Sequence, residues 1–144
     1  MTYYSLTPLI LFPFLYTLKD IEAICPIIGV NRNTGFFISN AINNIIQEGD
    51  VVTLNFGGRI VDDLGNHLKR GTVIIDGDAG DFVGSFMNGG SIDIKGNAGN
   101  CVGLDMSSGS ILIEKNAGYN VGSDMKGGSI MVKGNDLYYG PRLF

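Results

Sequence analysis

The sequence is poor in the residues that most often carry chemistry. It has no tryptophan, one histidine, two cysteines and four prolines among 144 residues. Cys25 and Cys101 have no CxxC spacing and no histidine cluster beside them. This pattern argues against zinc and iron–sulfur sites and predicts a reduced, cytoplasmic protein.

Basic residues are also few, and they are scattered along the chain. Ten lysines and arginines stand against fourteen acidic residues, which gives a net charge of −4. Proteins that bind nucleic acid normally gather their positive charge on one face, and no such cluster is visible. Nucleic acid is therefore not expected as a partner.

A membrane span and a signal peptide are not expected either. The apolar run at 6–18 has only 13 residues and is interrupted by Pro8 and Pro13, whereas a helix needs about 20 residues to cross a bilayer. The run is also not preceded by a basic region or followed by a small-residue cleavage site. We expect it to pack against protein, either a partner subunit or a second copy in a homo-oligomer.

Glycine, in contrast, is abundant and regularly spaced. The 22 glycines are about twice the usual ~7%. They recur every 19 residues in 71–89 (GTVIIDGDAGDFVGSFMNG), 90–108 (GSIDIKGNAGNCVGLDMSS) and 109–127 (GSILIEKNAGYNVGSDMKG), with a partial copy at 128–144 and a fainter one at 52–70. Such a repeat indicates a solenoid in which each unit buries its apolar face against the next.

Each copy contains two aliphatic residues separated by one, which is the pattern of a strand with one buried face. These inward pairs are Leu54/Phe56, Val73/Ile75, Ile92/Ile94, Ile111/Ile113 and Ile130/Val132. The sequence therefore predicts an all-β fold: a parallel β-helix of about five coils of about 19 residues.

The other recurring offsets predict corners and a core ladder. Two columns of glycine are expected at the corners: Gly65, Gly84, Gly103 and Gly122, and Gly80, Gly99 and Gly118. A core ladder is expected from Leu68, Met87, Met106 and Met125. A column of Asp78, Asn97, Asn116 and Asn135 is interpreted as a turn ladder, because Asp and Asn tolerate the left-handed conformation and bond their own backbone; a ligand-binding ladder is the alternative. Calcium is not expected, because the nonapeptide spacing is absent.

The flanks differ from the repeats. Ile38, Ala41, Ile42 and Ile45 recur at helical spacing, so a helix is predicted over about 35–48, with Asn33 or Thr34 as N-cap and Gly49 at its end. This helix is expected to cover the open end of the solenoid. The predicted organisation is thus an N-terminal segment at 1–50 and a β-helix domain at 51–144.

The C-terminal copy departs from the pattern. Asp136 and Leu137 replace Ala-Gly, and Pro141 takes a glycine position. The pair Tyr138/Tyr139 can either cap the core or meet a partner.

The repeat GGxIxIxGxAGxxxGxxMxGG resembles the GXGXG repeats found at the C-terminal end of the glutamate synthase large chain and in the β-helical chain of formylmethanofuran dehydrogenase. The resemblance covers about 52–135, and NRNTGFFISNAINNI is similar to the stretch that enters the β-helix in glutamate synthase. It implies a right-handed β-helix that is not catalytic. In such enzymes the domain resembles a spacer between the amidotransferase part and the flavin and iron–sulfur synthase part.

No residue is predicted to be catalytic, cofactor-binding or metal-ligating. His67 is expected to be an exposed loop residue, since Gly-x-Ser-x-Gly is absent and no nucleophile stands beside it. Asp105 and Asp124 share an offset and are expected to be solvated surface carboxylates. The expected function is a structural or interaction subunit of an oxidoreductase, with a stand-alone hydrolase acting on its outer face as the alternative. A hexapeptide acyltransferase is excluded by the period.

Overall fold

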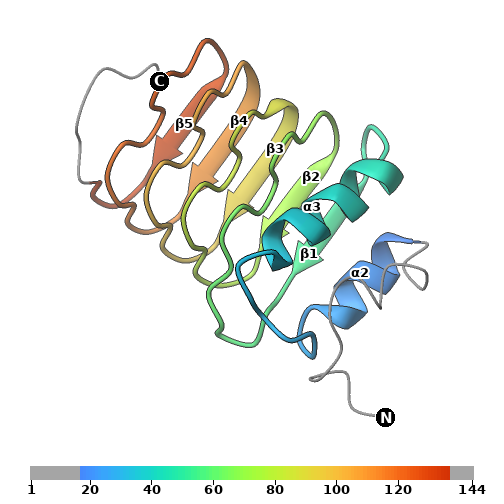
Figure 1. The fold of residues 1–144 in the computed structure, drawn as a ribbon. Helices are drawn as coiled ribbons and strands as arrows, with labels where there is room; N and C mark the ends of the chain where they lie inside the picture. Colours follow the sequence, from blue (N-terminus) through green and yellow to red (C-terminus); the bar gives the residue numbers. More distant parts are fainter. Residues whose placement is uncertain (1–16, 137–144) are drawn as a thin grey trace.

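The computed structural model describes residues 17–136 and shows a parallel β-helix (Figure 1). Two helices, α2 (Leu18–Ile24) and α3 (Thr34–Ile45), precede the five strands. The strands are β1 (Val51–Leu54), β2 (Thr72–Ile75), β3 (Asn88–Ile94), β4 (Ser108–Ile113) and β5 (Ser129–Val132). They form one sheet in the order β1-β2-β3-β4-β5, and every neighbouring pair is parallel. The predicted fold class is confirmed.

From β2 onward the paired strand residues are 19 apart, except at the start of β3, where Asn88 pairs with Ser108 across an irregularity. Thr72 pairs with Ser91, Ser91 with Ser110, and Ser110 with Ser129. The aliphatic pairs of these strands point inward, and their side chains are buried, as at Val73, Ile92 and Ile111, except for the partly buried Val132. Stacking then places equivalent apolar side chains in direct succession along the solenoid, which is what lets such short strands bury a continuous core.

The first coil departs from the predicted alignment. Val52 pairs with Val73 and Leu54 with Ile75, so the inward pair of β1 is Val52/Leu54, and the predicted Leu54/Phe56 is wrong by two residues. The extra length lies in the turn after β1, where Gly57 and Gly58 both have positive φ. Beyond this turn the step of 19 is restored. Alternation of apolar residues in VVTLNF fits both registers equally well, and Phe56 is itself buried.

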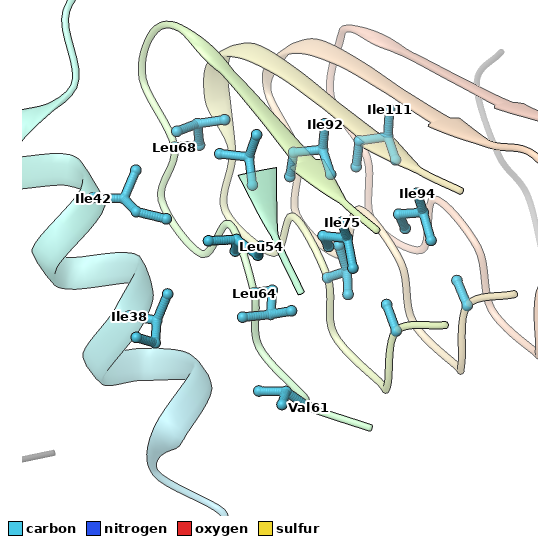
Figure 2. Close-up of a cluster of buried hydrophobic side chains, with 14 of the residues drawn as sticks. Ile38, Ile42, Leu54, Val61, Leu64, Leu68, Ile75, Ile92, Ile94 and Ile111 are labelled. Atoms are coloured by element: carbon cyan, nitrogen blue, oxygen red, sulfur yellow. The ribbon is translucent and has the colours of Figure 1, made fainter. Parts of the chain in front are cut away.

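Helix α3 covers the open end of the first coil. Ile38 and Ile42 point toward Leu54, Leu64 and Leu68 (Figure 2), and all five are buried. The helix also supplies hydrogen bonds that a preceding coil would otherwise provide. The helix runs from Thr34 to Ile45, whereas 35–48 was predicted. It ends earlier because the chain leaves the helix at Ile46 and forms a turn in which the Gln47 amide donates to Asp50 Oδ2 at 2.9 Å.

Two side-chain contacts fix α3 on the loop of the first coil. Ser39 Oγ donates to the Asp63 carbonyl at 2.9 Å, and Asn43 Nδ2 donates to the Asn66 carbonyl at 3.0 Å. Gly35 lies so close to this loop that a Cβ there would come within 1.6 Å of the Asp62 carbonyl oxygen. The backbones of helix and coil are therefore in direct contact.

Helix α2 was not expected from the sequence, although its capping box is visible there. Thr17 Oγ1 accepts from the Asp20 amide at 3.1 Å, and Asp20 Oδ2 accepts from the Thr17 amide at 2.8 Å. This reciprocal pair is a recognised signal for a helix start. Glu22 of this helix accepts from the Thr53 amide at 2.6 Å, which satisfies a backbone donor of β1. Helix α2 thereby protects part of the strand edge at this end of the sheet.

Glu22 gives a testable pH dependence. The hydrogen bond from the Thr53 amide is the main cause that lowers the pKa of Glu22 below its usual value, and Lys19 adds to it. A lowered pKa stabilises the fold above the unfolded-state pKa, and this contribution is lost as the pH falls through the folded-state pKa. The difference in melting temperature between the wild type and Glu22→Gln should therefore shrink between pH 6 and pH 3. The exposed Glu48→Gln is the control; an equal shrinkage there would contradict the assignment.

Within residues 17–136, no helix is long and apolar enough to cross a membrane. The apolar run up to Tyr16 and the residues Leu137, Tyr138, Tyr139 and Pro141 lie outside the described residues.

Candidate functional site

The predicted glycine columns occupy two kinds of position. Gly65, Gly84, Gly103 and Gly122 have φ between 71° and 74°, a conformation that strongly favours glycine. At Gly103 a Cβ would also lie 2.4 Å from Ile130 Cδ1 in the core. The core ladder of Leu68, Met87, Met106 and Met125 is buried beside this column.

The second glycine column makes room for side chains of the preceding coil. A Cβ on Gly99 would lie 2.2 Å from Asp81 Oδ1, and the same relation holds between Gly80 and Asp62 and between Gly118 and Asn100. These oxygens accept backbone amides one coil further along: Asp81 from Asn100, and Asn100 from Tyr119, both at 2.8 Å. This ladder was not predicted, although its members recur at 19-residue spacing.

The predicted Asp/Asn column is a turn ladder, with a different bonding pattern from the one expected. Asp78 Oδ1 accepts from the Asn97 amide at 2.7 Å, Asn97 from Asn116 at 3.0 Å, and Asn116 from Asn135 at 2.9 Å. The side chains therefore bond the next coil and not their own backbone. None of the four residues has positive φ, so left-handed tolerance does not explain the column.

The left-handed residues other than glycine occupy two different columns. One contains Asp63, Phe82, Cys101 and Asn120; the other contains His67, Phe86, Asp105 and Asp124. Asp and Asn are the usual residues in this conformation, and it is a genuine outlier for a bulky side chain. Phe82 and Phe86 therefore carry backbone strain at two offsets that the other coils fill mostly with Asp or Asn, and once each with Cys101 and His67.

Phe82 and Phe86 lie with two further rings at one exposed place beside α3. Phe36, on the outer side of α3, is 51% exposed, and Phe86 and Phe82 are 45% and 38% exposed. The rings of His67 and Phe86 stack with centroids 5.1 Å apart and planes 11° from parallel. We call the group of Phe36, His67, Phe82 and Phe86 the aromatic surface.

The aromatic surface surrounds a shallow hollow of about 520 Å³. Its lining is completed by the following residues: Asp63, Asn66, Ser85 and Leu104. Burial raises the pKa of Asp63, and the neighbouring carboxylates of Asp62 and Asp81 raise it further. The hollow thus combines aromatic faces with a local excess of negative charge.

A second, more polar hollow of about 470 Å³ adjoins the first across Phe36 and His67. Asn40, Asn43 and Asn44 of α3 line it together with Lys69. The Asn43 amide is oriented by its bond to the Asn66 carbonyl, and its Oδ1 is enclosed without a hydrogen-bond partner in the structure. The aromatic surface therefore continues into a carboxamide-rich margin.

The groups considered for chemistry are placed apart from one another. His67 is exposed and stacks on Phe86, while the nearby Ser85 hydroxyl donates to the Phe82 carbonyl at 2.9 Å. Asp105 forms an ion pair with Lys126 at 2.7 Å. Burial raises the pKa of the Cys25 thiol to about 12, which makes it a poor nucleophile. Among residues 17–136 no three His, Cys, Asp or Glu side chains gather where they could hold a metal ion.

Sequence reasoning missed the aromatic surface. Phe36 precedes the first coil, while Phe82 and Phe86 belong to the second, and no repeat column links the three in the sequence. The available signal was the presence of phenylalanine at two offsets that the other coils fill mostly with Asp or Asn.

No family model, curated protein or solved structure matches the chain.

Proposed function

We propose that the protein is a non-catalytic interaction module that binds a partner protein through the aromatic surface. The observation that supports this most is that the aromatic surface is energetically unfavourable in the isolated protein. A left-handed conformation costs a residue with a Cβ roughly 1–2 kcal/mol, and exposed phenyl rings add unfavourable contact with water. Burial against a partner protein would remove the rings from water and so offset this unfavourable free energy.

The resemblance to GXGXG domains supports an oxidoreductase of the glutamate synthase type as the setting. In such an enzyme the proposed partner is an amidotransferase chain or a flavin- and iron–sulfur-containing synthase chain. A scaffold like the β-helical chain of formylmethanofuran dehydrogenase would use the same surface. A cytoplasmic location and a homo-oligomer remain part of the proposal.

A stand-alone hydrolase is less well supported. Its outer face would need a nucleophile, a base and an orienting carboxylate within hydrogen-bond reach. His67 stacks on a phenyl ring and Ser85 bonds a backbone carbonyl. The described residues offer binding surfaces more readily than a catalytic arrangement.

The test replaces Phe82 and Phe86 together with asparagine, the residue that Asn120 already provides in the first left-handed column. Asparagine suits the conformation, so the melting temperature should stay within about 2 °C of the wild type or rise. Tagged full-length protein in its native host should retain an oxidoreductase or amidotransferase chain at constant stoichiometry, and the double variant should lose it.

The matched control is Ile60→Ala, which removes an exposed apolar side chain outside both hollows. It should leave the partner bound. Equal capture by the double variant, or a wild-type protein that purifies with no partner chain, would refute the proposal.

A further inference from the structure

We propose that the hollow of the aromatic surface receives an arginine side chain of the partner protein. This inference rests on the proposed function and names the chemistry by which the partner is recognised. It follows from the shape of the hollow, the character of its walls and the charges around it.

The walls suit a flat cation. Phe36 comes from α3, while Phe82 and Phe86 come from the second coil, so aromatic groups border the hollow from two elements. The His67 ring lies nearly parallel to Phe86 and adds a further planar surface. Guanidinium groups stack on aromatic faces and are less strongly hydrated than ammonium groups, which favours arginine over lysine.

The charges favour a cation as well. Asp63 lines the hollow, and no lysine or arginine does. The charges of Asp62 and Asp81 act on Asp63. Each uses Oδ1 in the ladder, where Asp62 accepts the Asp81 amide and Asp81 accepts the Asn100 amide, both at 2.8 Å. Lys69 lines the adjoining polar hollow and not this one.

The same observations explain the raised pKa of Asp63. Its carboxylate is partly buried and faces two like charges. A guanidinium group placed beside it would offset both effects, because an opposite charge stabilises the ionised form. A neutral apolar side chain would fill the hollow without relieving this unfavourable electrostatic environment.

Binding can be measured on the full chain by NMR chemical-shift titration with two peptides. The first is Ac-Ala-Leu-Arg-Leu-Ala-NH2, and the second replaces arginine with citrulline, which keeps the shape and removes the charge. We expect shifts confined to Phe36, residues 63–67 and residues 82–86. The citrulline peptide should bind about tenfold more weakly, which corresponds to about 1.4 kcal/mol.

Two variants test the negative charge and the aromatic wall separately. Asp63→Asn retains a residue that suits the left-handed turn, and Phe86→Asn removes one aromatic wall; each should weaken binding of the arginine peptide by about fivefold or more. Asp124→Asn is the matched control in the fourth coil, where the residue also has a positive φ and lies outside the hollow. It should bind like the wild type.

Three outcomes of the peptide titration would overturn the inference: equal binding of both peptides, shifts outside the hollow, or no binding. Concentration-dependent self-association that is lost on replacing Arg32 or Arg70 would assign the site to a second copy and would likewise overturn it. If both peptides bind equally while Phe82 and Phe86 are still needed for partner capture, only the arginine inference fails. If the arginine peptide binds but no partner is captured, only the proposed function fails.

Discussion

Replacing Gly35 with alanine should destabilise the protein by about 3 kcal/mol, the upper end of the usual cost of overpacking. The same change in an exposed helix interior normally stabilises by about 1 kcal/mol, because alanine is the better helix former. Here the new Cβ would lie 1.6 Å from the Asp62 carbonyl oxygen, and backbone cannot move aside as a flexible side chain can. Helix α3 would have to lift from the first coil.

Thermal unfolding monitored by circular dichroism measures this effect, and a loss of roughly 10 °C is expected. Asn40→Ala is the control, since Asn40 lies in the same helix and is exposed. It should be neutral or slightly stabilising. A Gly35→Ala variant that melts at or above the wild-type temperature would show that the helix does not dock as described.

Replacing Gly103 with valine should destabilise by a similar amount, about 3 kcal/mol, through two separate effects. The residue has a φ of 71°, which a β-branched residue adopts only with strain. Its Cβ would also meet Ile130 Cδ1 at 2.4 Å, so the core of the neighbouring coil would have to rearrange. Urea unfolding should show a lower midpoint for Gly103→Val than for the wild type.

Gly58→Ala separates the two effects. Gly58 has a φ of 85°, and a Cβ there would meet nothing within 4 Å. This variant should lose only about 1 kcal/mol, from the strained backbone alone. If Gly103→Val is no more destabilising than Gly58→Ala, the contact with Ile130 has no energetic weight.

The repeat made most of the fold predictable, because stacking demands the same residue type at the same offset in every coil. Val73, Ile92 and Ile111 mark the strands unambiguously for this reason. The first coil was harder, since its extra residues lie in a turn and Val52, Leu54 and Phe56 alternate without marking the register. A sequence period identifies strands that repeat with constant spacing, and it does not fix the register of a coil of different length.

The aromatic surface could not be predicted by the same reasoning. Its position depends on where α3 docks and on which turn residues are left-handed, and both are properties of the assembled coil. Phe82 and Phe86 occupy what look like ordinary variable positions in the sequence. Their positive φ and their exposed rings, together with the exposed Phe36 beside them, distinguish them from core phenylalanines.

The constant step between coils makes the length of the protein adjustable without disturbing its candidate interface. The aromatic surface uses α3 and the first two coils, whereas the last strands lie at the far end of the sheet (Figure 1). Inserting or deleting one whole 19-residue unit between β3 and β4 would preserve both side-chain ladders and move the two ends by about 4.8 Å. The number of coils thus sets the distance between a partner bound at the helical end of the β-helix and any group that contacts its other end.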